Sequence, residues 1–159
     1  MVKIELENGK IIKIELDETA APLTVANFKK LVGRGFYDGL TFHRVIPGFM
    51  IQGGDPLGNG MGGAEETIKG EFAQNGVKNP IRHVRGVISM ARAYDPNSAS
   101  SQFFIMHKDS PHLNGEYAAF GIVVDGLDIV DAIAGVKTNY NDQPMDDVVI
   151  TSIRFVTEK

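Results

Sequence analysis

The sequence predicts a mainly β fold, a closed eight-stranded antiparallel β-barrel capped by two α-helices. Three observations indicate it: short runs of alternating apolar and polar residues recur along the chain, clusters of Gly, Pro, Asn and Asp separate these runs, and only two segments carry apolar residues at helical spacing. Closing the sheet removes its exposed edges, which favours a barrel for so many short strands. At 159 residues the chain suits one domain, over residues 1–159.

The first two strands are expected at residues 2–6 and 12–16, joined by a tight turn. A two-residue loop would set Ile4 opposite a lysine, whereas a three-residue loop over residues 7–9 sets it opposite Ile12. The longer loop keeps the apolar residues of both strands on one face. We therefore predict it, with its glycine left-handed in a bulge.

Two segments follow the helical period. Residues 22–32 carry one apolar stripe, with a proline in the first turn and Gly33 placed to end the helix. A shorter helix is expected over residues 127–134, ending at Gly135. The remaining strands are predicted within a hairpin at 41–56 and in the segments 86–91, 102–106, 118–123 and 148–156.

The hairpin within residues 41–56 holds the most informative polar residues. Strand alternation places Arg44 in one run of apolar residues and Gln52 in the other, and Pro47-Gly48 between them is typical of a type II turn. A lone arginine more often packs its stem on a sheet while its head reaches water. Because a second polar group lies on the facing strand, we expect instead a buried cation beside an amide in one cavity.

Composition limits the partners and the compartment. A formal net charge of -4 argues against nucleic acid and against an anionic membrane surface, since phosphate binding relies on concentrated Lys and Arg. The chain has no cysteine, which excludes disulfides, thiolate metal ligands and a cysteine nucleophile. Its N-terminal residues alternate like a strand instead of forming the apolar core of a secretory signal, and no run of about 18 apolar residues predicts a membrane span. We therefore predict a cytoplasmic protein.

Several motif-like features lack the context that their function requires. Gly58, Gly60 and Gly63 match a dinucleotide-binding spacing, but no parallel strand precedes them and no helix follows. The four histidines lack metal-ligand spacing, and no G-x-S-x-G sequence supports a serine nucleophile. We expect neither a cofactor nor a metal. We interpret His43, which points away from Arg44 along its strand, as a hydrogen-bonded structural residue.

The predicted pocket holds a cation, an amide and large apolar groups, without a nucleophile, a metal or an acid–base pair. Rotation about a prolyl peptide bond needs no more, because no bond breaks and the barrier of about 18–20 kcal/mol is the loss of amide resonance. A protein lowers this barrier by seating the proline ring in an apolar well and donating hydrogen bonds to the twisted amide. The alternative is a proline-peptide binding or chaperone module whose catalysis is incidental.

Two segments closely resemble the cyclophilin family of peptidyl-prolyl cis-trans isomerases. They are FHRVIPGFMIQGGD at residues 42–55 and SQFFI at residues 101–105. Similarity also covers residues 22–28, 86–91 and 113–121, so it spans nearly the whole chain. The compact loops make the chain similar to prokaryotic, single-domain members.

The resemblance implies one groove with divided roles. Arg44 would donate a hydrogen bond toward the prolyl nitrogen as its lone pair localises, and Gln52 would orient the substrate backbone; these are the two expected catalytic residues. The proline well would be formed by Phe49, Met50, Phe104 and Leu113. The other expected substrate-binding residues are Ala91, Arg92 and Gln102, which line the groove for residues before the proline, with the main chain of Arg92 on the substrate backbone, and His112 and Tyr117 at the rim.

Three positions depart from the best-known family members. His112 stands where many have tryptophan, so the resemblance implies weakened cyclosporin binding. Tyr117, where many have histidine, keeps an aromatic ring beside the well. Arg92, where many have asparagine, adds positive charge and predicts a preference for acidic residues before the proline. The expected partners are proline-containing peptides and unfolded or folding proteins, bound by a monomer that assists folding.

Overall fold

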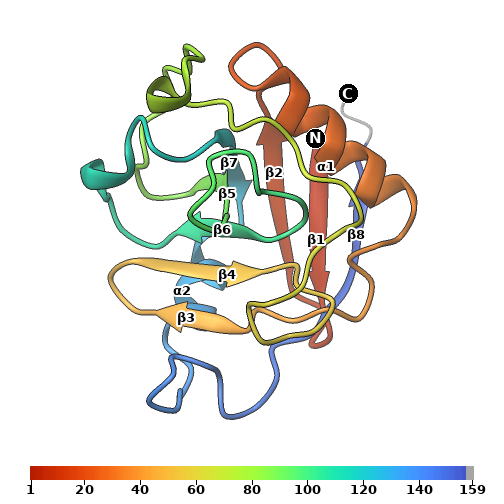
Figure 1. Cartoon of the computed structure of the whole chain (residues 1–159). Helices are drawn as coiled ribbons and strands as arrows, with labels where there is room; N and C mark the ends of the chain where they lie inside the picture. Colours follow the sequence, from red (N-terminus) through yellow and green to blue (C-terminus); the bar gives the residue numbers. More distant parts are fainter. Residues whose placement is uncertain (157–159) are drawn as a thin grey trace.

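The computed structural model describes residues 1–156 and shows one curled antiparallel sheet with two helices packed against it (Figure 1). The helices are α1 (Pro22–Gly33), beside β8, and α2 (Leu127–Ala134), which contacts β2, β3 and β4. The eight strands are β1 (Val2–Leu6), β2 (Ile11–Leu16), β3 (Arg44–Ile46), β4 (Met50–Gly53), β5 (Val87–Met90), β6 (Phe103–Met106), β7 (Ala119–Asp125) and β8 (Ile150–Phe155). The mainly β class with two α-helices is thus confirmed.

The sheet runs in the order β3-β4-β6-β5-β7-β2-β1-β8, and every neighbouring pair is antiparallel. Its two edges, β3 and β8, do not pair as strands within residues 1–156. Instead Thr41, before β3, bridges Val149, before β8. Gly39 N–H donates to Ile150 O at 2.8 Å, and Ile150 N–H donates to Leu40 O at 2.7 Å. The sheet is therefore a curled half-barrel, and the closure that the sequence predicts is a short bridge and not a strand ladder.

The first hairpin has the register that alternation predicts. Ile4 pairs with Ile12 and Val2 with Ile14, so the apolar residues of both strands share the buried face. Gly9 ends the loop with φ 84°, a left-handed conformation that costs glycine little. The predicted three-residue loop is confirmed.

Both α-helices lie where the helical period places them, although α1 extends through Gly33. Two short 3-10 helices, η1 (Ala73–Asn75) and η2 (Pro111–Leu113), were not predicted, since three residues are too few to show a period. Within residues 1–156, no helix combines the length and apolar character needed to cross a membrane.

The core gathers on the concave side of the sheet, under α1. Phe28 of α1 packs on Phe103 of β6 and Phe120 of β7 with ring centroids 5.9 and 5.2 Å apart. Successive residues of β6 face opposite sides of the sheet, so Phe103 enters this core whereas Phe104 joins a second cluster with Met50. The second cluster lies on the outer face, and it forms the floor of the candidate site.

Candidate active site

The β3-β4 hairpin brings the two predicted catalytic residues face to face. Arg44 and Gln52 are direct cross-strand partners, and the Arg44 Nη1 donates to Gln52 Oε1 at 3.2 Å. The connecting turn has Gly48 at φ 78°, and Phe49 N–H donates to Ile46 O at 3.0 Å. This geometry is that of a type II turn, as Pro47-Gly48 predicts.

Arg44 is exposed, and the prediction of a buried cation is wrong. β3 begins at Arg44, so the fully buried Phe42 lies before the strand and does not share a face with Arg44 by alternation. Within the strand, Val45 is the inward residue and is fully buried. The guanidinium therefore lies at the exposed border of the site.

A chain of side-chain amides holds Arg44 in place. Gln52 Nε2 donates to Gln102 Oε1 at 2.9 Å, which leaves the Gln52 Oε1 directed at Arg44. Gln102 Nε2 in turn donates to the carbonyl oxygens of Gly60 and Gly62 at 3.1 and 2.8 Å. Each amide thus has one orientation that satisfies its partners, and the chain links the guanidinium to the backbone of the glycine-rich loop.

A hollow of about 120 Å³ lies beside this chain. Met50 and Phe104 are nearly fully buried in its floor, and Leu113 of η2 closes one side. The hollow is lined by Arg44, Phe49, Met50, Gln52, Ala91, Arg92, Phe104, Leu113 and Tyr117. The structure therefore brings together the whole predicted site except Gln102 and His112.

The two remaining residues lie at the borders of the hollow. One is His112, whose ring stacks on Phe49 with centroids 5.8 Å apart. Tyr117, which lines the hollow itself, meets the Phe104 ring edge-on at 5.6 Å. The other is Gln102, which lines a second, adjoining hollow of about 230 Å³. That second hollow is lined by Gln52, Gly60, Met61, Gly62, Ala91, Arg92, Ala93, Ser98, Ser100 and Gln102.

A family model described as cyclophilin type peptidyl-prolyl cis-trans isomerase/CLD matches residues 1–155. The chain belongs to this family. The reaction of such enzymes is the interconversion of cis and trans prolyl peptide bonds, for which the hollow and its polar border are suited.

Named relatives and solved structures agree. The chain is 54% identical over 123 residues to peptidyl-prolyl cis-trans isomerase B of Bacillus subtilis, covering 77% of this chain and 82% of that protein. It is 41% identical over 159 residues to peptidyl-prolyl cis-trans isomerase-like 1 of Gibberella zeae, covering 99% and 96%. A Cryptosporidium parvum cyclophilin type isomerase, crystallised in the presence of the dipeptide Ala-Pro, superposes with a TM-score of 0.90 at 34% identity over 99% of each chain.

The guanidinium of Arg92 contacts two aromatic rings and three carbonyl oxygens of this cyclophilin. Its guanidinium lies over the rings of Phe72 and Tyr117, 4.9 and 4.7 Å from their centroids. Its nitrogens donate to the carbonyl oxygens of Glu116, Ala93 and Tyr94. The sequence did not indicate this arrangement, because Phe72, Glu116 and Tyr117 are distant from Arg92 in the chain. Within residues 1–156 the backbone N–H and C=O of Arg92 have no backbone hydrogen-bond partner.

A polar pair that the sequence did not single out lies behind the well. His83 is 1% exposed and stacks on Phe104, with ring centroids 6.0 Å apart. Its Nε2 lies 2.9 Å from the Ser89 Oγ, and its Nδ1 lies 3.1 Å from the Asn114 Oδ1. The Asn114 Oδ1 is an acceptor, so Nδ1 carries the proton and Nε2 accepts from the serine hydroxyl. Burial lowers the pKa of His83, which keeps the ring neutral beneath Phe104.

The glycine-rich loop is held by one carboxylate. Asp55 accepts hydrogen bonds from the backbone N–H groups of Leu57, Asn59 and Gly60 at 2.8, 3.0 and 2.5 Å. Burial acts to raise the pKa of Asp55, but these bonds outweigh it and lower the pKa. The loop has an ordered role as the wall of the second hollow, which its glycine spacing alone does not reveal.

His43 differs from its expected state. It is 6% exposed and lies directly before β3, and neither ring nitrogen has a hydrogen-bond partner within the described residues. The interpretation of His43 as a hydrogen-bonded residue is therefore wrong. Burial lowers its pKa, so the ring is neutral.

Proposed function

We propose that Arg44 is the electrostatic centre of prolyl isomerisation in this protein. The amide chain through Gln52 and Gln102 carries the proposal, because it directs the Arg44 guanidinium along the border of the well without burying it. As the prolyl amide twists, its nitrogen lone pair localises and becomes a hydrogen-bond acceptor. A donor held at that point stabilises the twisted state more than the planar one, which is the condition for catalysis.

The substrate has two halves in this proposal. The proline ring occupies the well formed by Phe49, Met50, Phe104 and Leu113, whose apolar surface excludes water. The residues before the proline run toward Gln102 and the second hollow, and their backbone pairs with the free N–H and C=O of Arg92. Proline-containing segments of unfolded or folding proteins are the proposed substrates.

A binding module is the second candidate function. Its support is the well itself, which can hold a proline ring whether or not the bond rotates. Arg44 separates the two candidates, because binding of the ring needs the apolar well but no cation aimed at the prolyl nitrogen.

The test is cis-trans exchange of an Ala-Pro-Phe peptide, measured by NMR with the natural chain and with Arg44→Ala. We expect the variant to lose about 100- to 1,000-fold in turnover, as for removal of one donor to a developing charge, while the peptide still binds. Arg34→Ala, which removes an exposed arginine at the end of α1, is the control for net charge. Binding without acceleration in the natural chain would favour the module, and equal turnover in Arg44→Ala would refute the role of Arg44.

Three further proposals depend on the sequence. We propose a cytoplasmic location, with which a cysteine-free composition is compatible, and a monomeric state. Weak cyclosporin binding is proposed because the ring at the rim is His112, which stacks on Phe49 but offers less apolar surface than an indole.

A further inference from the structure

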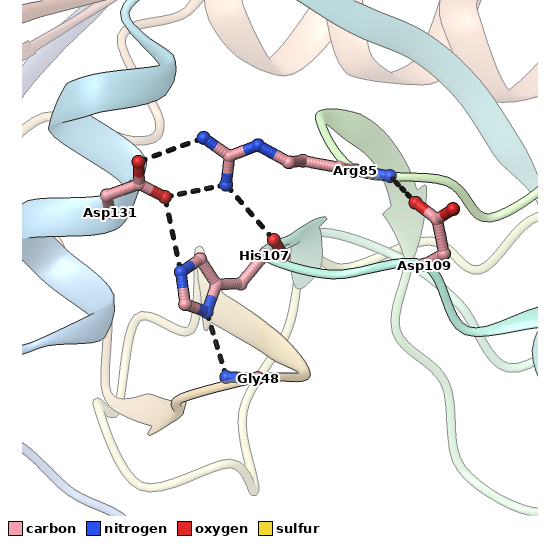
Figure 2. Close-up of polar contacts among 5 residues, drawn as sticks. All are labelled: Gly48, Arg85, His107, Asp109 and Asp131. Atoms are coloured by element: carbon pink, nitrogen blue, oxygen red, sulfur yellow. Dashed lines mark hydrogen bonds and ion pairs between the residues drawn. The ribbon is translucent and has the colours of Figure 1, made fainter.

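The remaining histidine, His107, lies outside the groove, at the point where three elements meet (Figure 2). His107 follows β6, and its Nδ1 lies 2.8 Å from the backbone nitrogen of Gly48 in the β3-β4 turn. On the other side of the ring, Nε2 lies 3.2 Å from the Asp131 Oδ1 of α2. The ring thus connects the hairpin that carries Arg44 to a helix on the other side of the sheet.

The contacts determine the tautomer of this ring. The backbone nitrogen of Gly48 can only donate, so the Nδ1 of His107 must carry no proton and act as the acceptor. The proton then resides on Nε2, which donates to Asp131. A carboxylate behind a histidine ring selects its tautomer and orientation in the same way elsewhere in proteins.

Asp131 is itself held in position. Arg85 donates to both of its oxygens, at 2.6 and 2.9 Å, and lowers the pKa of Asp131, which keeps it a carboxylate. The same guanidinium donates to the carbonyl oxygen of His107 at 3.1 Å, and the backbone nitrogen of Arg85 donates to Asp109 at 2.8 Å. Figure 2 shows these groups as one connected network that ends at the Gly48 nitrogen. Next to His107 in the sequence stands one further charged residue, Lys108.

The turn needs such support because of its place in the sheet. Within the part of the chain that the structure describes, β3 is an edge strand that pairs only with β4, so no neighbouring strand holds the outer side of the turn. Gly48 directly precedes Phe49, a lining residue of the well, and the backbone N–H of His107 also donates to Phe49 O at 2.9 Å. His107 therefore holds two consecutive residues of the turn, one through its ring and one through its backbone.

We propose that His107 is a positioning residue for the proline well, acting through its ring on the Gly48 N–H to fix where Phe49 lies. It does not touch the substrate. The inference depends on the proposed function for the identity of the well, but it concerns binding of the proline ring and not the action of Arg44. Loss of the ring contact should weaken ground state and transition state alike, which raises KM and leaves kcat unchanged.

Two substitutions separate the two bonds of the ring. His107→Asn places an amide oxygen near the Nδ1 position, so it keeps an acceptor for the Gly48 N–H and loses the reach to Asp131. His107→Gln places its amide near the Nε2 position, so it keeps the contact with Asp131 and loses the acceptor for Gly48. We expect KM for the Ala-Pro-Phe peptide to rise by about 3- to 10-fold in His107→Gln, the range of one neutral hydrogen bond, and to stay near the natural value in His107→Asn.

Two NMR measurements on the same proteins do not depend on turnover. Hydrogen exchange at the Gly48 amide should be faster in His107→Gln than in His107→Asn, and the ring nitrogen shifts of the natural chain should show a proton on Nε2 only. Equal KM values and equal Gly48 exchange in the two variants would overturn the proposal, as would a proton on Nδ1. If Arg44→Ala kept full turnover, the proposed role of Arg44 would fail, while peptide affinity and Gly48 exchange would still decide the role of His107.

Discussion

The well and the adjoining hollow share a wall at Gln52, Ala91 and Arg92, yet they are built in different ways. The well lies in the hollow of about 120 Å³, and its apolar lining, Phe49, Met50, Phe104 and Leu113, belongs to a packed apolar cluster. The second hollow, about 230 Å³, is lined mainly by loop residues between positions 60 and 62 and between 93 and 100. One half of the groove is thus part of the sheet, and the other is a loop surface attached to it.

The difference continues beneath each half. Under the well, His83 has a partner for each ring nitrogen and stacks on Phe104. Under the glycine-rich loop lies the His43 ring, whose Nε2 is 3.8 Å from the position that a Cβ of Gly60 would take. Neither ring nitrogen of His43 has a hydrogen-bond partner within the described residues. The support of the loop comes from the Asp55 carboxylate. The floor of the well is therefore held by dense packing, whereas the loop wall of the second hollow is held by a few hydrogen bonds.

The largest effect should follow from removing the floor of the well. Phe104 is 5% exposed, so Phe104→Ala should lower the free energy of unfolding by about 3–5 kcal/mol and abolish measurable peptide binding. Met61→Ala, in the hollow, removes a side chain that is 82% exposed and should change stability by less than about 0.5 kcal/mol. Urea unfolding and peptide titration measure both. Similar losses in the two variants would contradict the contrast between the halves.

The second effect tests the chain of amides that joins the halves. Gln102→Ala removes the acceptor for Gln52 and both donors to the loop carbonyls. We expect kcat to fall by about tenfold, because the loss of one oriented hydrogen bond raises the activation free energy by roughly 1.4 kcal/mol. Gln102→Glu keeps the acceptor for Gln52 but sets a carboxylate oxygen against the carbonyl oxygens of Gly60 and Gly62, so a loss at least as large is expected. NMR exchange of the Ala-Pro-Phe peptide measures both variants. If Gln102→Ala kept full kcat, Gln52 and Arg44 would not need this support.

Much of the groove could be predicted because its residues lie close together in the sequence. Alternation and the Pro47-Gly48 turn were enough to bring Arg44 and Gln52 to one cavity, and the resemblance added the residues of β6 and η2. The burial of Arg44 was predicted wrongly, since the start of β3 could not be located to the residue.

The contacts that could not be predicted join segments far apart in the chain. Arg92 lies between Phe72 and Tyr117, and neither ring is near it in the sequence. The bridge between Thr41 and Val149 likewise depends on how far the sheet curls, which no local pattern records. Local rules thus place side chains within a hairpin, whereas tertiary packing decides which of them remain free for a ligand.

A third prediction concerns the two buried histidines. Burial lowers the pKa of both His83 and His43, so below about pH 6.5 the unfolded chain binds protons that the folded chain does not. The free energy of unfolding should therefore be constant above this pH and fall as the solution is acidified through it. Urea unfolding at a series of pH values measures the fall, and His83→Gln and His43→Gln should each remove part of it. A constant free energy between pH 7 and pH 5 would show that neither ring is kept neutral by folding.

The smallest effect should be the charge preference before the proline. The sequence predicts that Arg92 favours acidic residues there, but its guanidinium already bonds three carbonyl oxygens and lies against two rings. A substrate carboxylate would have to break these contacts, so only a screened, long-range attraction remains. We expect Glu-Pro peptides to exceed Lys-Pro peptides in kcat/KM by about twofold or less, with the difference lost in high salt. A larger preference that persists in salt would mean that Arg92 leaves Phe72 and Tyr117 to pair with the substrate, and the wall between the two halves would then be mobile.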